Sequence, residues 1–168
     1  MTAPAQRSGV ADVLLTTFRF EVTFNRVAGA GAQRLGDGGF QEVTGLDVEM
    51  DVKDYEEGGR NDGIVRRVGR AKYSPLVCKR GMFGPEGGDA VPELWQWFQD
   101  IVAGVRPVRR YDGTVVVQDQ RGRPAAAWLF RAALPVKLVG PQLNARTGEV
   151  AVEELHLAHE GLLLEGTA

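Results

Sequence analysis

The heptapeptide FRFEVTF at residues 18–24 alternates large apolar side chains with polar ones over its whole length. In an extended chain successive side chains point to opposite faces, so the apolar side chains all share one face. These side chains are Phe18, Phe20, Val22 and Phe24. The period of two predicts a strand that packs one side against a core and leaves the other in water.

A second alternating run at 47–53 predicts another strand with one buried face. Its apolar side chains are Val48, Met50 and Val52, and its polar face is rich in carboxylates. The segment EEGGRNDG at 56–63 consists mostly of turn-forming residues, and the chain becomes extended again from 72 to 79. Residues 46–80 are therefore predicted to form one long hairpin.

One helix is predicted, in the segment DAVPELWQWFQDIVAG at 89–104. Apolar side chains recur there at intervals of three and four residues, as they do on the buried side of an amphipathic helix. They are Leu94, Trp97, Phe98 and Ile101. Trp95 lies off this stripe, so it is a candidate for contact with a neighbouring subunit.

The C-terminal half is predicted to form strands. Segments 114–119 and 126–139 read as a second hairpin, in which the even-numbered residues from Trp128 to Leu138 share one face. A final strand starts near Glu149, and its apolar pattern changes phase part-way along. A β-bulge would restore one apolar face across that change. The residues expected to form it are Glu153 and Glu154.

These elements predict a mainly β fold: a small antiparallel β-barrel or sandwich with one flanking α-helix and a long protruding hairpin loop. The length of 168 residues fits a single domain at 14–165, preceded by a flexible N-terminal arm at 1–13. The 22 glycines agree with many turns between short strands.

Composition excludes several classes of protein. The formal net charge of −2 gives no basic excess for a dedicated nucleic-acid binder. No stretch approaches the roughly 18 apolar residues of a membrane-spanning helix, and the N-terminus lacks the pattern of a signal peptide. We therefore expect a soluble chain that is made in the cytoplasm and does not insert into a membrane.

No catalytic, metal-binding or cofactor motif is present, and we expect no enzyme activity. His156 and His159 are the only histidines, and on a strand residues three apart point to opposite faces, which disfavours a shared metal. Cys78 is the only cysteine, and nothing in the sequence supplies the base that would activate it, so a half-buried strand position is expected.

The charge distribution carries more information than any motif. Residues 41–57 hold seven carboxylates and one lysine, a net charge of −6, and residues 58–80 hold seven cations and one carboxylate, a net charge of +6. Two explanations remain open. The opposite charges could pair across one hairpin, or the acidic part of one copy could meet the basic part of the next in a repeating interface.

Taken together, the chain resembles the tail tube protein family of contractile phages, R-type pyocins and extracellular contractile injection systems. The resemblance covers most of residues 18–162 and follows the family's order of elements. Its matching segments are FRFEVTF (18–24), GFQEVTGLDVEMDVKDYEEGG (39–59), AKYSPLVCKRGM (71–82), LWQWFQDIVAG (94–104), RRYDGTVVVQDQRGRPAAAWLFRAALPVKLVGPQLNA (109–145) and EVAVEELHLAHEGL (149–162).

The resemblance implies six copies in a ring, rings that stack into a hollow rigid tube, and a surrounding sheath, with baseplate and tube-terminator proteins at the ends. It also implies that the long hairpin contacts neighbouring subunits and the adjacent ring. The residues given this role are Tyr55, Glu56, Glu57, Gly58, Gly59, Arg60, Asn61, Asp62, Arg66, Arg67 and Arg70. A polar face could line the lumen, and its candidates are Asp47, Glu49, Asp51 and Lys53.

The basic group Arg66, Arg67 and Arg70 would hold phosphate if it lay in the lumen, so protein effector cargo is favoured over DNA. The long N-terminal arm and the glycine-rich segment at 28–39 are features that a tube-initiating relative could have. Two other functions stay open: a ring-forming carrier or chaperone like those of type VI secretion, and, more remotely, a small split-barrel flavin enzyme.

Overall fold

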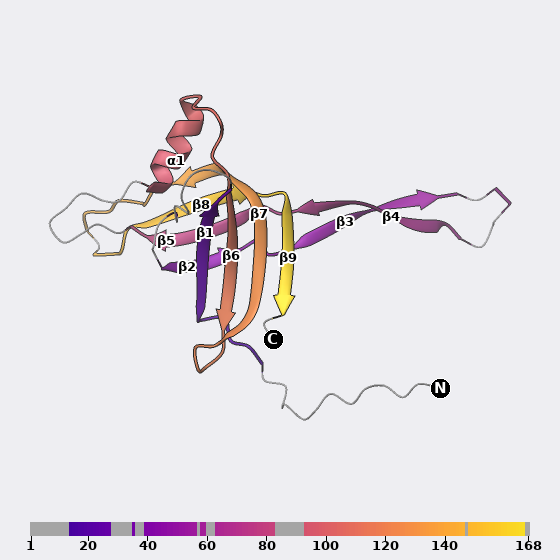
Figure 1. The fold of residues 1–168 in the computed structure, drawn as a ribbon, viewed down its shortest axis with the longest axis horizontal. Coiled ribbons are helices and arrows are strands. Elements are labelled where there is room, and N and C mark those ends of the chain that lie inside the picture. The colour runs from indigo at the N-terminus through magenta and orange to yellow at the C-terminus, as the bar shows by residue number, and fades with distance from the viewer. Residues whose placement is uncertain are drawn as a thin grey trace.

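The computed structural model describes residues 14–27, 35, 39–56, 58–59, 63–82, 93–146 and 148–166. The described chain is mainly β, as predicted, with one helix (Figure 1). Its elements are β1 (Phe20–Arg26), β2 (Phe40–Thr44), β3 (Val48–Tyr55), β4 (Val65–Tyr73), β5 (Leu76–Gly81), α1 (Glu93–Val102), β6 (Tyr111–Gln118), β7 (Pro124–Val139), β8 (Val152–Ala158) and β9 (Gly161–Gly166). The predicted N-terminal arm lies outside the described residues.

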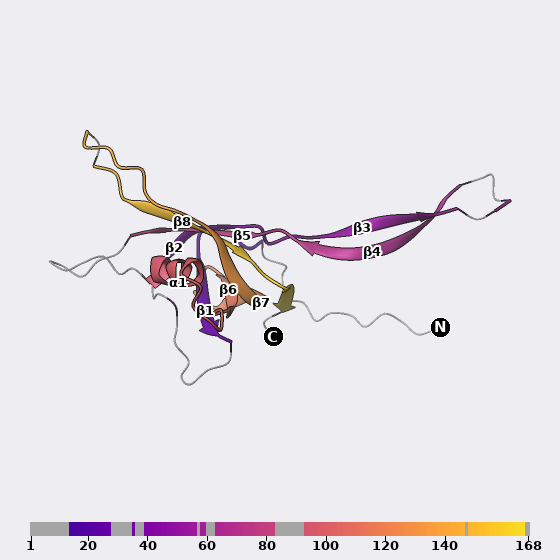
Figure 2. The ribbon, with the colours of Figure 1, turned by 90° about the horizontal axis from the view of Figure 1, so that it is seen from above.

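Two antiparallel layers share the long strand β7. Its first half pairs with β6 and β9, and β1 pairs with β6, giving a layer in the order β1-β6-β7-β9 that we call sheet A. Its second half pairs with β8, which is followed by β5 and β2, giving sheet B. Figure 2 shows the two layers edge-on. Because β1 and β2 do not pair in the described chain, the body is a sandwich open at that side.

β7 passes from one sheet to the other at Ala132. This residue has a φ of 52°, and the pairing of β6 with β7 shifts register beside it. The carboxylate of Asp112 accepts a hydrogen bond from the Ala132 backbone N–H at 2.8 Å, which holds the kink. The predicted shared face of 128–138 is therefore wrong: after the bulge the buried residues are Ala133 and Pro135, and Val136 is exposed.

The core lies between the sheets and is closed at one end by α1. Phe24 packs edge-on against Phe130, with ring centroids 5.6 Å apart, and Trp97 of α1 packs against Tyr111 at 4.7 Å. The Trp97 indole N–H donates to the Arg109 carbonyl oxygen at 3.0 Å. The predicted helix is present with Leu94 and Trp97 buried, but it spans fewer residues than expected, and residues 89–92 lie outside the described chain.

Three sequence expectations about the strands are wrong. β1 begins at Phe20, and Phe18 is exposed in the turn before it. The predicted bulge at 153–154 is absent, because β8 pairs with β5 in unbroken register and Glu153 points into the core. The C-terminal segment forms two strands rather than one, since β9 follows β8 after a turn. β2 was not predicted at all.

The predicted hairpin at 46–80 is divided in two by the structure. β3 and β4 pair only with each other, while β5 belongs to sheet B. We call β3 and β4 the projecting hairpin, since it extends away from the body beyond β9 (Figure 1). The expected burial of Val48, Met50 and Val52 is wrong, because the projecting hairpin leaves the body and both of its faces meet solvent.

Candidate interaction surface: the projecting hairpin and the edges of sheet A

The projecting hairpin is an antiparallel ribbon with one β-bulge. Its register runs from Val48 opposite Tyr73 to Tyr55 opposite Val65, and it shifts between Met50 and Val52. At the shift Gly69 lies so close to Asp51 that a Cβ atom there would be 2.8 Å from the Asp51 carbonyl oxygen. Glycine is therefore the residue that allows the two strands to approach at the bulge.

One face of the projecting hairpin is apolar along most of its length. Val48, Met50, Val52 and Val68 are 54–73% exposed, and Tyr73 lies opposite Val48 at the root. A two-stranded ribbon with both faces in water is at best marginally stable by itself. An exposed apolar face on such a ribbon is typical of an interaction surface.

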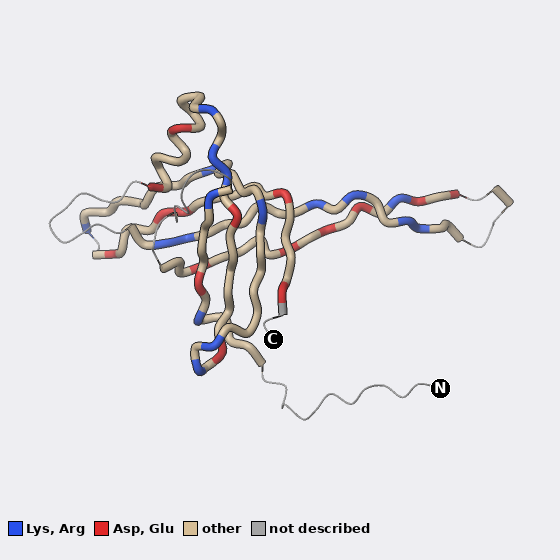
Figure 3. The backbone as a smooth tube through the Cα atoms, viewed as in Figure 1, with Lys and Arg blue, Asp and Glu red and all other residues tan. Residues whose placement is uncertain are grey.

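The other face bears Glu49, Asp51 and Lys53, which alternate along β3. Over the hairpin as a whole, carboxylates lie mainly on β3 and cations mainly on β4 (Figure 3). Lys72 pairs with Asp51 at 2.7 Å, which raises the pKa of the lysine through the hydrogen bond and the charge of that carboxylate. Arg66 lies 3.7 Å from Asp54, and this pair sits at the outer end of the apolar face, because Asp54 follows Val52 by two positions on β3. Pairing across one hairpin therefore accounts for part of the opposite charge seen in the sequence.

Some of the cations on the projecting hairpin make no ion pair within the described residues. β3 and β4 hold five cations and three carboxylates. Within the described residues Arg70 makes no ion pair, and the guanidinium of Arg67 stacks over the Tyr55 ring at 4.6 Å. The ribbon therefore presents exposed cations to solvent.

The root of the projecting hairpin is tied to the body. The Ser74 hydroxyl donates to Asp47 at 2.9 Å, and His159 Nε2 lies 3.1 Å from the Ser74 carbonyl oxygen. His159 Nδ1 lies 3.0 Å from the Gly161 carbonyl oxygen, and its ring packs against Tyr73 at 5.4 Å. His159 therefore links the hairpin root to the turn between β8 and β9.

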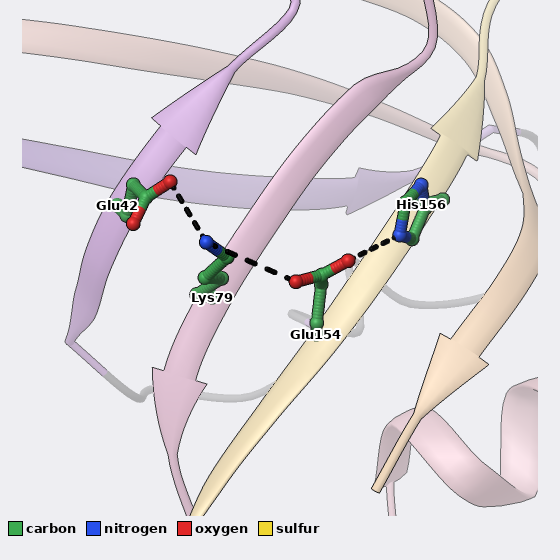
Figure 4. Close-up of polar contacts among 4 residues, drawn as sticks. All are labelled: Glu42, Lys79, Glu154 and His156. Atoms are coloured by element: carbon green, nitrogen blue, oxygen red, sulfur yellow. Dashed lines mark hydrogen bonds and ion pairs between the residues drawn. The ribbon is translucent and has the colours of Figure 1, made fainter.

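His156 belongs to a different group of side chains, on the outer face of sheet B (Figure 4). Glu154 lies 2.5 Å from His156 Nε2 and 3.9 Å from the Lys79 ammonium, which donates to Glu42 at 3.0 Å. The bond to Glu42 raises the pKa of Lys79. Across the described chain no group of three or more histidine, cysteine or acidic side chains is arranged to hold a metal ion.

Sheet A has two edge strands, β1 and β9, that pair on one side only in the described chain. Leu163 and Leu164 on β9 are 56% and 57% exposed. Unpaired edges with apolar side chains invite pairing with another chain. β9 was not predicted from the sequence, although the run of three leucines in GLLLEG was a signal for a further apolar strand.

The structure places the predicted interface residues as follows. Tyr55, Arg66, Arg67 and Arg70 lie on the projecting hairpin, and Glu56, Gly58 and Gly59 lie at its tip. Glu57, Arg60, Asn61 and Asp62 lie outside the described residues. The candidate lumen residues Glu49, Asp51 and Lys53 alternate along β3 on its charged face, and Asp47 directly precedes that strand.

Two side chains singled out in the sequence have roles inside the chain. Cys78 is 1% exposed, deeper than the expected half-buried position, and burial raises its pKa to about 12. The Trp95 indole N–H donates to Glu153 at 3.1 Å, so this tryptophan contacts its own body.

Residues 16–163 match the family described as T4-like virus tail tube protein gp19. The chain belongs to this tail tube family. The resemblance found in the sequence is confirmed, and the chain is a structural tube subunit, a component of a phage tail or a related injection particle. No curated protein matches it in sequence.

Solved structures share the fold of this tail tube protein. A chain in the anti-feeding prophage baseplate has a TM-score of 0.74 at 21% identity, covering 92% of this chain and 97% of the other. A chain in the sheath–tube complex of the PVC extracellular contractile injection system has a TM-score of 0.73 at 21% identity, covering 94% and 95%. A chain in the anti-feeding prophage cap has a TM-score of 0.72 at 22% identity, covering 99% and 100%.

None of the helices in the described part of the tail tube protein has the length and apolar character needed to cross a bilayer.

Proposed function

We propose that this tail tube protein forms hexameric rings that stack into the rigid hollow inner tube of a contractile injection system or phage tail. The observation that carries the proposal is a ribbon with an exposed apolar face outside the body, combined with unpaired edges on both sides of sheet A. Surfaces of this kind at different places on one chain build heterologous contacts, which close into rings or propagate into tubes.

The two surfaces make different contacts in the assembly. The edges of sheet A join neighbours within a ring, because strand pairing removes both unpaired edges at once. The projecting hairpin reaches a second copy in the same or the adjacent ring, through the residues from Tyr55 to Arg70. Its cations then meet carboxylates of the next copy and fix the register between them.

The remaining partners follow from the same proposal. The outer surface of the tube meets a sheath protein, and its ends meet baseplate and tube-terminator proteins, as in the particles whose chains share this fold. The chain assembles in the bacterial cytoplasm, has no catalytic role, and conducts protein cargo rather than DNA. Residues 14–165 act as the single structural unit.

Which surface lines the lumen is a separate proposal. Asp47, Glu49, Asp51 and Lys53 are one candidate, since they form a continuous polar row. The outer face of sheet A, with Thr23 and Thr114 in register, is the alternative. Cysteines placed at Glu49 or at Thr114 in assembled tubes distinguish them: the lumen position resists a maleimide reagent too large to enter the channel and reacts after disassembly.

A second function keeps some support. The fold is shared, at a TM-score of 0.52 and 10% identity, with a protein of the type six secretion system. A ring-forming carrier of that kind would stay as discrete rings in solution and co-purify with a cargo protein. A tube subunit instead stacks its rings into filaments.

The experiment that tests the proposal reverses charge on the projecting hairpin. We expect Arg66→Glu with Arg67→Glu to leave the circular dichroism spectrum and the unfolding midpoint unchanged, because both residues are exposed away from the body. The same variant should lose long tubes in negative-stain images, with rings or short stacks remaining. The matched control is Arg121→Glu with Arg146→Glu, which changes charge equally at exposed sites outside the hairpin. If the hairpin variant still forms full-length tubes, the projecting hairpin has no role in the stacking of rings.

A further inference from the structure

The two edges of sheet A are built to fit each other. The four strands alternate in direction, so β9 and β1 run antiparallel across the sheet. Rotation about an axis that runs along the strands keeps each strand's direction. In a ring, β9 of one copy would therefore lie antiparallel to β1 of the next, which is the arrangement of every other pair in sheet A.

The apolar inner face of sheet A is exposed to solvent at β9. One row of facing residues crosses the sheet through Val22, Val115, Trp128 and Leu164. Val22 and Val115 are buried at 7% and 2% exposure, whereas Leu164 is 57% exposed. The same apolar row thus begins in the core and ends in solvent, so an apolar side chain of another molecule is needed beside Leu164.

Charge on the outer face selects the register of the pairing. Glu21 on β1 and Glu165 on β9 lie in the same row, through Val116 and Ala127. An unshifted continuation of the sheet would set Glu165 against Glu21 of the next copy, and like charges directly opposite are destabilising. A shift of two residues sets Glu165 against Arg19 instead, and a closed barrel requires such a stagger between its strands.

Arg19 occupies a strand position although it precedes β1. Its carbonyl oxygen accepts the Gln118 backbone N–H at 3.0 Å, which continues the ladder between β1 and β6 by one residue. Its side chain donates to the Gln120 carbonyl oxygen at 3.0 Å, and among the described residues it makes no ion pair. Glu165 is exposed and likewise makes no ion pair within the described chain.

We propose that β9 of one copy pairs with β1 of the next in the register that sets Glu165 opposite Arg19 and Leu164 opposite Phe20. This inference rests on the proposed ring and specifies its contact. The ion pair lies on the outer face of sheet A, and Leu164 completes the apolar row on the inner face against Phe20 of the neighbouring copy.

Exchange of the two charges is the first test. Arg19→Glu and Glu165→Arg should each raise, by about five- to tenfold, the protein concentration at which half of the chain is in rings. The double variant restores an opposite pair and should assemble near the wild-type concentration. Arg19→Glu also removes the hydrogen bond to Gln120, and a change at Glu165 cannot restore that bond. Rescue in the double variant therefore reports on the ion pair. A double variant that assembles no better than the single variants overturns the register.

Disulfide trapping is the second test. Glu21→Cys with Leu163→Cys places two thiols opposite each other in the proposed register, whereas Thr23→Cys with Leu163→Cys places them opposite in the unshifted one and keeps Arg19, Glu21 and Glu165. Only directly opposed pairs approach the Cβ separation of about 4 Å that a disulfide needs. The two edges of one copy are three strand spacings apart, about 14 Å, so any bond must join two copies. Cys78 is buried and does not interfere.

We expect covalent multimers up to the hexamer from the first pair on oxidation, and monomer from the second. Wild-type rings with no cross-linking of the first pair would overturn the register and leave the ring itself standing. If the wild type forms no rings and neither pair cross-links, the ring and the register both fail.

Discussion

Arg80 and Glu153 show how a pair of charges can occupy core positions in this fold. Their side chains are 7% and 3% exposed, and the Arg80 guanidinium donates to Glu153 at 2.6 Å. The second carboxylate oxygen of Glu153 accepts the Trp95 indole N–H. The pair therefore connects β5, β8 and α1, and every buried side-chain nitrogen and oxygen atom in the described chain has a hydrogen-bond partner.

Breaking this pair should be far more costly than replacing it. Glu153→Leu leaves the Arg80 charge buried without a partner, and we expect it to lower the free energy of unfolding by about 3–5 kcal/mol. The double variant Arg80→Met with Glu153→Leu removes both charges and should recover most of that loss. Urea unfolding of the wild type, the single variants Arg80→Met and Glu153→Leu, and the double variant measures the coupling. Additive losses in the double variant would show that the pair does not act as a unit.

The thiol of Cys78 provides a probe of the folded body. Burial raises its pKa to about 12, so little of the thiol is ionised to thiolate at pH 8. Burial also keeps a labelling reagent in solution from reaching the sulfur atom. We expect a thiol-specific reagent at pH 8 to label native protein only as fast as the body opens, and to label urea-unfolded protein completely. Rapid labelling of native protein would contradict the burial of β5 between its neighbours.

The projecting hairpin should be dispensable for folding of the body. β3 and β4 pair only with each other, so they add little to the sandwich. Replacement of residues 51–70 by Asn-Gly keeps Met50 opposite Ala71 and closes the shortened hairpin with a two-residue turn. We expect an unfolding free energy within about 1 kcal/mol of wild type, and no stacked tubes in electron micrographs. Loss of the folded body would show that the ribbon supports it.

Sequence periodicity predicted the strands better than it predicted their surroundings. The alternation in β1 was correctly assigned to a buried face, because Val22 and Phe24 meet sheet B. The same alternation in β3 was assigned to a buried face as well, yet that ribbon leaves the body. Alternation reports two different faces on a strand, and only the tertiary structure, or here the assembly, decides what covers the apolar one.

The errors at β7 and β8 have local causes that a pattern does not reveal. β7 changes partner sheet at Ala132, so its apolar phase shifts where alternation alone predicts continuity. In β8 the polar residue Glu153 occupies a core position because Arg80 pairs with it there. Arg80 is 73 residues away in sequence, so the pattern around Glu153 does not reveal this partner. Of the candidate surface, the hairpin and its charged residues were found from the sequence. The edge strand β9 was not, since its continuous apolar run lacks a period.

The body and the projecting hairpin together explain why this chain suits a repeating assembly. The sandwich is complete in its core and incomplete at the edges of sheet A, while the hairpin carries an apolar face that the same copy leaves in solvent. Each deficit is of a kind that another copy can fill. Under the proposed function, neighbouring copies cover the surfaces that one copy leaves exposed.

Mass and shape in solution test this account most directly. We would measure the mass of the purified full chain by light scattering over a range of concentrations, and examine the same samples by negative-stain electron microscopy. The account predicts a species of six copies of the 18.2 kDa chain, about 109 kDa, seen as hollow six-fold rings that stack into tubes as concentration rises. A chain that stays at 18.2 kDa at every concentration, and also when a baseplate ring is added as a template, would contradict it.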